Sequence, residues 1–359
     1  MASRSLIVAL SIILLALSLA YLLHLKRSEV HVYLYRFNAT LMNNGTSPMP
    51  LRELTILRIF PNTTSQFSRI QYICYSVNGR IYYEYLLQRD RDGNVVVNLT
   101  RAPTLLYPNS TFNVQLTMEI RVAPLKLEPE INVGHSGGLS DVPRDLKEVY
   151  CTSTPLWNVE DFHVKSLAYK LLNDSNALQT VLSFAKWIDF NVRYPKKLDR
   201  HLVWYPNQTY LELEGDCDDR ANLLITLCRC VGIPSYLQYG VIYEPGVIKR
   251  TSYSKNFYRT SRSMGWHGWA MVYVPPWGWL PVDLTYFEGA SKVEVEGSIY
   301  VRCEDPLMHI TGALVAREPI IIAGNITVTD YMASNRSLLE LLAKYEAYLV
   351  ENEELSVKA

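Results

Sequence analysis

A cysteine, a histidine and an aspartate occur in this order along the chain, each beside a predicted structural element. Cys217 lies in the segment Gly-Asp-Cys-Asp-Asp-Arg-Ala, which opens an apolar run typical of a helix. His267 precedes a β-patterned run, and Asp283 lies near the end of the next one. A thiol, an imidazole and a carboxylate are the groups of a Cys-His-Asp nucleophilic site. The order and setting of the three residues therefore predict a site of this kind, with Cys217 as the nucleophile.

The thiol of Cys217 needs a base, because the thiolate is the attacking species. A helix N-terminus favours a negative charge by only about 0.3–1 kcal/mol. The carboxylates of Asp216, Asp218 and Asp219 flank the sulfur in the sequence and oppose its ionisation. We therefore expect the activation to come mainly from contact with the imidazolium of His267.

The spacing between His267 and Asp283 predicts that their side chains meet on one face of a sheet. If Val274 pairs with Gly278 across an antiparallel turn, Asp283 lies opposite Trp269 and one diagonal step from His267. Such diagonal neighbours are about 7–8 Å apart, within reach of a side-chain hydrogen bond. This geometry requires a turn with an odd number of residues, since an even turn without a bulge would place the two on opposite faces.

Four segments of the chain resemble the transglutaminase-like superfamily. They read Gly-Asp-Cys-Asp-Asp-x-Ala-x-Leu-Leu, Gly-Ile-Pro, His-x-Trp before a strand, and Gly-Trp-x-x-x-Asp-x-Thr. In this chain they are Gly215 to Leu224, Gly232 to Pro234, His267 to Trp269, and Gly278 to Thr285. The resemblance spans roughly residues 160–290, and it departs from the common His-Ala-Trp at Gly268.

This resemblance implies a papain-like fold, in which the cysteine helix packs on an antiparallel sheet that carries the histidine and the aspartate. It makes Cys217 the nucleophile, His267 the general base and acid, and Asp283 the residue that orients the imidazole. The implied reaction passes through a thioester and transfers an acyl group of a protein or peptide substrate to an amine or to water. No metal or organic cofactor is implied.

The oxyanion and substrate contacts stay open at this stage. The backbone N–H of Cys217 is one expected oxyanion donor. Trp204 and Gln208 are both candidates for the second donor, and the spacing does not choose between them. Trp269 belongs to a group of tryptophans that fits either a substrate groove or the core beside the sheet.

The patterning of the chain predicts an α+β protein with four parts. Residues 1–29 form a membrane anchor, and residues 30–125 contain short strands with frequent turn signals, typical of a β-sandwich. Residues 126–330 form the transglutaminase-like core of helices followed by antiparallel strands. Residues 331–359 are expected to form an amphipathic helix that docks on the core. A basic stretch at 249–262 is interpreted as a loop beside the site, either a lid or binding rim or, as the favoured alternative, a merely solvated loop.

The N-terminus contains 18 uncharged residues from Leu6 to Leu23, enough to nearly cross a hydrocarbon core of about 30 Å. We interpret it as an uncleaved single-pass anchor, and the alternative is a signal peptide cleaved near Ala20. Sequons for N-glycosylation occur throughout the rest of the chain and favour an extracytoplasmic location on the cell membrane. Their asparagines are Asn38, Asn44, Asn62, Asn98, Asn109, Asn173, Asn207, Asn325 and Asn335.

Charge and cysteine usage exclude other functions. Lys plus Arg and Asp plus Glu both total 35, so there is no basic surplus for nucleic acid. The spacing of the six cysteines matches no zinc motif. Cys74, Cys151 and Cys303 could include one disulfide, while Cys228 is expected to be a small core residue.

The alternative is a non-enzymatic protein that keeps the fold as a surface binding or scaffolding module. The pKa of the Cys217 thiol distinguishes the enzyme from this module. A reactive Cys217 should have a pKa well below about 8.5, and an ordinary or raised value would favour the binding module.

Overall fold

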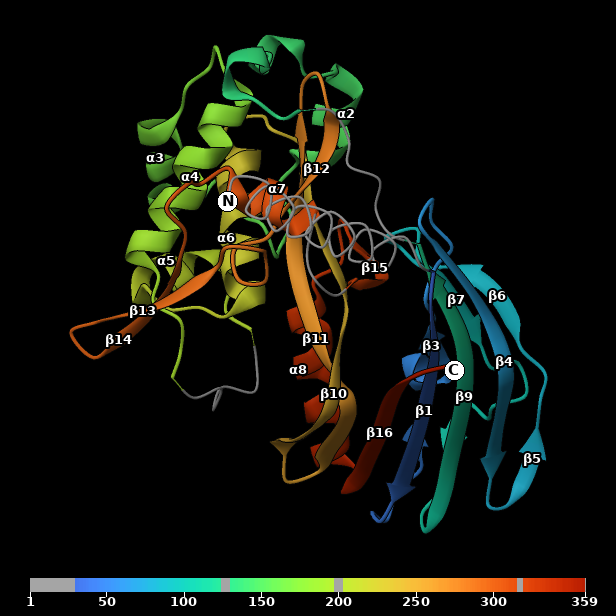
Figure 1. Ribbon diagram of the computed structural model, residues 1–359. Helices are drawn as coiled ribbons and strands as arrows, with labels where there is room; N and C mark the ends of the chain where they lie inside the picture. The colour runs from blue at the N-terminus through green and yellow to red at the C-terminus, as the bar shows by residue number, and fades with distance from the viewer. Residues whose placement is uncertain (1–29, 124–129, 197–202, 315–318, 359) are drawn as a thin grey trace, which may run out of the picture.

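A large mixed sheet runs through most of the protein (Figure 1). The computed structural model describes residues 30–123, 130–196, 203–314 and 319–358. Within this part of the chain the strand order is β15-β10-β11-β16-β1-β9-β4-β5, and β12 pairs with β11. The strands are β1 (His31–Asn43), β4 (Gln66–Val77), β5 (Arg80–Tyr82), β9 (Ser110–Val122), β10 (Ser235–Ser254), β11 (Phe257–Val274), β12 (Gly278–Val282), β15 (Ile321–Ile326) and β16 (Ala347–Val357).

Helices gather at one end of this sheet, beside β10 and β11 (Figure 1). They are α2 (Arg144–Tyr150), α3 (Phe162–Leu171), α4 (Ala177–Asn191), α5 (Pro206–Glu212), α6 (Cys217–Cys230) and α7 (Met308–Leu314), while α8 (Tyr331–Lys344) precedes β16. Asn176 caps α4, because its side chain accepts a hydrogen bond from the backbone N–H of Gln179. The apolar faces of α3, α4 and α6 form one core with β10, β11 and β12.

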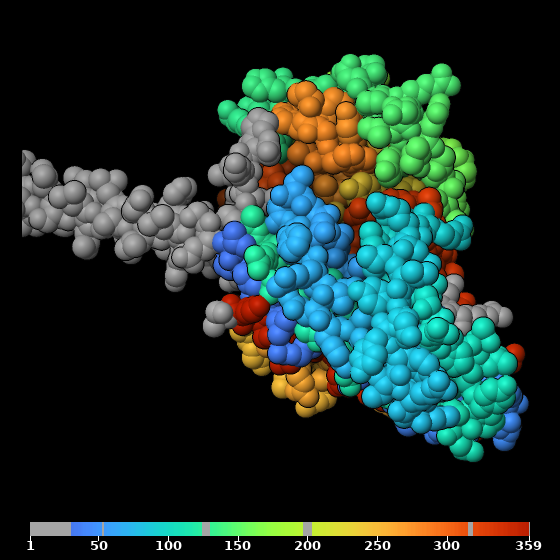
Figure 2. All heavy atoms as spheres, turned by 90° about the vertical axis from the view of Figure 1, so that its right-hand side faces the viewer, coloured from blue at the N-terminus to red at the C-terminus, as the bar shows by residue number. Residues whose placement is uncertain are grey.

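The N-terminal strands form a second core, but they are not a separate sandwich. A three-stranded sheet of β3 (Ile56–Arg58), β7 (Val95–Asn98) and β6 (Leu86–Arg89) contributes buried side chains such as Leu57 and Val97 to this core. The free edge of β1 pairs with β16, so the large sheet continues into the helical half. Figure 2 shows these N-terminal strands as one broad face of the molecule, below the segments of the helical half. The expected sandwich is thus only partly formed, and its predicted boundary at residue 125 is crossed by the sheet.

Two local features of this region follow directly from its sequence. Asn78 and Gly79 join β4 to β5 in a tight hairpin, and both have positive φ angles, of 49° and 83°. In β9 the side chains at every second position from Val114 to Val122 are buried, which is the expected period of a half-buried strand.

The C-terminal segment differs from the predicted single helix. Helix α8 starts after Asp330, whose side chain caps Ala333, and it ends at Lys344. Residues 347–357 then form β16, antiparallel to β1 and parallel to β11. Leu349, within the predicted helix, lies in this strand because a strand here pairs with both β1 and β11. Non-local pairing of this kind overrides local helical periodicity.

The stretch at 249–262 is also different from the loop that was predicted. It forms the two arms of a long hairpin, in which Lys249 pairs with Ser261. Arg259 of this hairpin donates to Glu351 of β16 at 2.7 Å. The charged residues therefore lie on extended strands and not on a lid.

The other small sheets are two-stranded. They pair β2 (Met49–Pro50) with β8 (Leu105–Leu106), and β13 (Ser291–Val295) with β14 (Ser298–Arg302). No helix of the described residues is long and apolar enough to cross a membrane. The anchor predicted at residues 1–29 lies outside the described residues. All six cysteines, including the buried Cys228, are free thiols, so the structure contains none of the disulfides considered for Cys74, Cys151 and Cys303.

A fully buried ion pair ties α6 to α4. The guanidinium of Arg220 donates to Asp189 Oδ1 at 2.8 Å and to the Val301 carbonyl at 3.1 Å. Replacing Arg220 with methionine removes one partner and leaves a buried carboxylate, so we expect a loss of about 3–5 kcal/mol in the free energy of unfolding by urea denaturation. Arg144→Ala, which removes an exposed pair with Glu148, is the control and should leave this free energy unchanged. If Arg220→Met changed the free energy of unfolding as little as the control does, the buried ion pair would not stabilise the fold.

Candidate active site

The N-terminus of α6 places Cys217 beside the strand that carries His267. Cys217 is the first residue of α6, and Asp216 is the N-cap. The following turns of α6 are buried in the helical core and pack on β11. The backbone N–H of Gly268, the residue after His267, lies close enough to the sulfur to lower the pKa of the Cys217 thiol slightly. The thiol therefore lies next to the main chain at the histidine.

The register of β11 and β12 brings His267 and Asp283 together. Val274 pairs with Gly278 and Ala270 pairs with Val282, as the odd-turn prediction requires. His267 Nε2 lies 2.6 Å from Asp283 Oδ2, and both side chains are buried. Because Asp283 occupies Nε2, the nitrogen left to exchange a proton with another group is Nδ1.

A tight turn after β12 fixes the Asp283 carboxylate. Its Oδ1 accepts hydrogen bonds from the backbone N–H groups of Thr285 and Tyr286, both at 2.9 Å. The hydroxyl of Thr285 also faces this oxygen at 3.4 Å. One carboxylate oxygen is thus held by the turn while the other faces His267, which gives the Asp-x-Thr spacing a structural reason.

The electrostatic setting favours the charged form of His267. Burial alone would lower the pKa of this imidazole. The Asp283 carboxylate opposes this through its charge and its hydrogen bond, and Asp218 adds a smaller effect, so the pKa of His267 is raised above 6.5. The side chain is therefore suited to receive a proton.

The thiol of Cys217 is in its neutral form in this arrangement. Burial raises its pKa well above 9, and the charges of Asp218 and Asp216 raise it further. The Sγ atom lies 3.2 Å from Asp218 Oδ1, where the S–H donates to the carboxylate. Among the hydrogen bonds of the described residues, none joins this thiol to His267, so Asp218 is its present partner.

Gly268 makes room for this contact. A Cβ atom at residue 268 would lie 2.8 Å from Asp218 Oδ1, closer than real contacts allow. The common alanine at this position of the motif would push the Asp218 carboxylate aside. Glycine in place of the common alanine at residue 268 therefore permits the hydrogen bond between Asp218 and Cys217.

The three substrate or oxyanion candidates have other contacts. The backbone N–H of Trp204 donates to Asp219 Oδ1 at 2.7 Å. The side-chain oxygen of Gln208 accepts from the N–H of Tyr205 at 3.0 Å and caps α5. Trp269 is only 5% exposed, and its ring stacks on His267 with a centroid separation of 5.8 Å. Trp269 thus lies at the site, as a packing partner of the imidazole.

Comparison with known proteins agrees with this geometry. The family model described as the transglutaminase-like superfamily matches residues 165–284, which contain Cys217, His267 and Asp283. These residues are a transglutaminase-like domain. The match covers about a third of the chain, and the strands on the N-terminal side lie outside it.

Solved structures extend the likeness beyond the transglutaminase-like domain. A candidate cysteine protease from Cytophaga hutchinsonii is 16% identical, covers 92% of both chains and has a TM-score of 0.51. This shows a shared fold over most of the length. The periplasmic domain of TgpA from Pseudomonas aeruginosa is 13% identical over 72% of this chain and 88% of its own, with a TM-score of 0.33. Red sea bream transglutaminase is 11% identical over 89% of this chain and 63% of its own, with a TM-score of 0.31. No curated protein matches the chain.

The sequence did not reveal that the acidic residues near Cys217 have different roles in the transglutaminase-like domain. Asp219 was counted only as a repulsive charge, but its Oδ2 accepts from the N–H of Asp216 and its Oδ1 accepts from Trp204. Gly215 allows this fold of the chain, because a Cβ there would lie 2.7 Å from the Cβ of Asp219. The capping spacing between residues 216 and 219 was the available signal.

Proposed function

We propose that the protein is a thiol-dependent acyl transferase or amide hydrolase in which Cys217, His267 and Asp283 act together. The observation that carries the proposal is the 2.6 Å hydrogen bond between buried His267 and Asp283, one residue away from the amide that contacts the Cys217 sulfur. A protein or peptide acyl group is the expected substrate, because residues 165–284 match the transglutaminase-like superfamily, whose resemblance implies such substrates.

In this mechanism His267 takes the thiol proton as the sulfur attacks. Nδ1 receives the proton, and Asp283 at Nε2 stabilises the imidazolium that results. The leaving amine then takes the proton from Nδ1, and the acyl group stays on Cys217 as a thioester. Water or a second amine attacks the thioester while His267 accepts its proton. The C–S bond then breaks, the acid or the new amide leaves, and the proton on His267 returns to the Cys217 sulfur. The backbone N–H of Cys217, at the first position of α6, is one oxyanion donor.

The thiol must leave Asp218 before this reaction. In the structure Asp218 holds the S–H, so the resting thiol is neutral and its proton passes to His267 only when the sulfur turns toward Nδ1. This assigns Asp218 the role of a positioning residue that keeps the thiol in a resting orientation.

We expect Asp218→Asn to increase the reactivity of the resting thiol. The substitution removes the carboxylate charge that raises the pKa of Cys217 while it keeps the size of the side chain. The rate of alkylation of Cys217 by iodoacetamide near pH 7.5 should rise by about tenfold or more, since a close charge shifts a pKa by about one unit or more. Peptide mapping gives the rate for each cysteine, and Asp145→Asn on the surface of α2 is the control. An unchanged rate would remove Asp218 from this role.

The raised pKa of His267 sets the acid limb of the pH profile. The imidazole must be neutral to accept the thiol proton, and Asp283 favours its charged form. As the pH falls through this raised pKa, His267 becomes protonated and kcat/KM should fall, with a midpoint above pH 6.5. The measurement is kcat/KM against pH with a peptide or activated ester substrate. A midpoint near pH 4, typical of a preformed thiolate, would contradict the proposal.

A binding module without turnover is the second candidate function. The raised pKa of Cys217 favours it, because a buried neutral thiol beside two carboxylates is unreactive at rest. A search for turnover with peptide, amine and ester substrates separates the two. Binding of a peptide without formation of product or acyl-enzyme would select the module.

We further propose that the N-terminal 29 residues anchor the protein in the cell membrane with its bulk outside the cytoplasm. The apolar run and the nine sequons support this location. Exposed asparagines of these sequons, such as Asn44, Asn62 and Asn335, are accessible to a modifying enzyme. Protease treatment of intact cells should digest the protein, whereas protection until lysis would contradict this orientation.

A further inference from the structure

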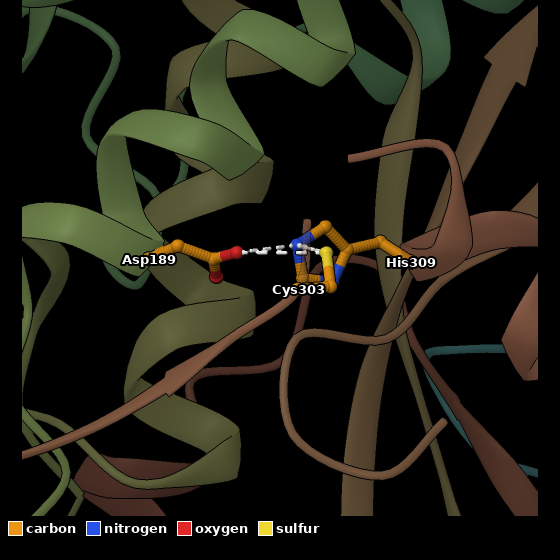
Figure 3. Close-up of side chains that lie close together, drawn as sticks. All are labelled: Asp189, Cys303 and His309. Carbon is orange, nitrogen blue, oxygen red and sulfur yellow. Dashed lines mark hydrogen bonds and ion pairs between the residues drawn. The ribbon is translucent and has the colours of Figure 1, made fainter. Parts of the chain in front are cut away.

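A second group of a cysteine, a histidine and a carboxylate lies next to the backbone of Asp283. Asp189 of α4, Cys303 after β14 and His309 of α7 converge on one point (Figure 3). The Cys303 sulfur lies 3.5 Å from His309 Nε2, and this nitrogen lies 2.8 Å from Asp189 Oδ2. The sulfur is 3.9 Å from the same carboxylate oxygen. Asp189 and His309 are buried, and Cys303 is partly exposed.

The other polar atoms of Asp189 and His309 already have hydrogen-bond partners. His309 Nδ1 lies 2.9 Å from the carbonyl oxygen of Asp283, which only accepts, so Nδ1 carries a proton. Arg220 donates to Asp189 Oδ1 at 2.8 Å. The atoms left to face one another are therefore Nε2, Oδ2 and the sulfur. Metal sites show this arrangement, in which a carbonyl fixes the histidine tautomer and a donor fixes the carboxylate.

The group does not suit a second nucleophilic site. A base must have a nitrogen free to take the thiol proton while the carboxylate holds the other nitrogen. In His309 the Asp283 carbonyl holds Nδ1, and Asp189 and Cys303 both face Nε2. Burial, followed by the charges of Asp189 and Asp305, raises the pKa of the Cys303 thiol to about 12. The imidazole cannot both pair with Asp189 and deprotonate the sulfur through one nitrogen.

We propose that Asp189, Cys303 and His309 bind a divalent zinc ion. Sulfur, imidazole and carboxylate are the ligands of zinc, and in a tetrahedral site with bonds of about 2.0–2.3 Å the ligand atoms lie about 3.3–3.6 Å apart. The three observed separations bracket this range, so shifts of about half an ångström bring the atoms into place. A fourth ligand, a water molecule, can approach from the side where Cys303 is exposed.

The cation would also lie close to a negative charge. Asp189 supplies a carboxylate whose other oxygen accepts from Arg220, and the Cys303 sulfur also lies 3.1 Å from the Asp305 carbonyl oxygen.

Such an ion would stabilise the position of Asp283. Two hydrogen bonds join His309 to Asp283: His309 Nδ1 donates to the Asp283 carbonyl oxygen, and the Asp283 N–H donates to the His309 carbonyl oxygen at 3.0 Å. Zinc would join α7, the end of β14 and α4 around this link. The spacing of the cysteines predicts no zinc motif, because only one of them takes part and Asp189 is 114 residues away from it. The proposal is independent of the role of Cys217.

The test is titration of the full-length chain, purified in detergent and stripped with a chelator, with Co²⁺ as a spectroscopic substitute for Zn²⁺. We expect one tightly bound ion per chain, with a thiolate-to-cobalt charge-transfer band and the strong visible bands of a tetrahedral site. Excess Zn²⁺ should displace the cobalt and raise the Tm by about 5 °C when it exceeds the Kd about 100-fold. No binding by the wild-type chain would overturn the proposal.

Two variants assign the ligands. Cys303→Ser should remove the charge-transfer band, and Cys217→Ala should keep it and the stoichiometry of one. The opposite pattern would place the ion on the nucleophile and overturn the proposal. If Cys303→Ser does not fold, X-ray absorption at the zinc edge of the wild-type protein decides the matter. One sulfur with nitrogen and oxygen ligands is expected, and two or more sulfurs would contradict the assignment.

Discussion

Replacing Cys217 with alanine is expected to abolish turnover, with a loss of about 10⁴-fold or more in kcat. The variant has no nucleophile to form the thioester, although the fold, the His267–Asp283 pair and the oxyanion donor at α6 remain. The substrate can therefore still bind, and KM should change far less than kcat. Alanine is also a good helix former, so α6 should keep its start at residue 217.

This prediction is tested with kcat and KM measured on the best substrate from a peptide, amine and ester screen. Cys151→Ser is the matched control, since Cys151 is another partly exposed free cysteine and lies outside the proposed site. It should retain wild-type turnover. Turnover by Cys217→Ala within tenfold of wild type would show that another group is the nucleophile.

The Asp283→Asn variant should keep its structure and lose about 10³–10⁴-fold in kcat. The amide oxygen of asparagine can still accept from the backbone N–H groups of Thr285 and Tyr286. Its NH₂ group then faces His267 Nε2, which must be unprotonated to accept, so the proton moves to Nδ1. The nitrogen that should receive the thiol proton is thereby blocked.

The readout for Asp283→Asn separates catalysis from stability. We expect KM and the Tm to stay near wild-type values while kcat falls, and we expect the acid limb of the pH profile to move to lower pH because the charge that raises the pKa of His267 is gone. Asp330→Asn, at the cap of α8, is the control. A kcat within tenfold of wild type would remove Asp283 from the mechanism.

The contact between His267 and Asp283 could be predicted from the sequence, because it depends on strand parity and a short turn. The positions of Val274, Gly278 and Asp283 fix the register once the turn has three residues, and the structure has this register. The start of α6 at Cys217 was likewise predicted, from the apolar run that follows it.

Features that depend on distant pairing could not be predicted. Strand β16 forms because β1 and β11 leave a place for it, and nothing local to Leu349 reveals that place. His309 had no context in the sequence, yet it contacts both Asp189 and Asp283 in the fold. The acidic residues near Cys217 were correctly expected to oppose ionisation, but the hydrogen bond from the thiol to Asp218 depends on the close approach of Gly268, which no spacing rule gives.

The most direct test of the central claim is mass spectrometry of the acyl-enzyme. Incubation with an activated acyl ester should place one acyl group on Cys217 of the wild-type chain, and water or an added amine should then remove it. In His267→Gln, both formation and removal of this thioester should slow by about 100-fold or more, the usual contribution of a general base. No adduct on Cys217, or the same rates in His267→Gln, would contradict the joint action of the thiol, the imidazole and the carboxylate.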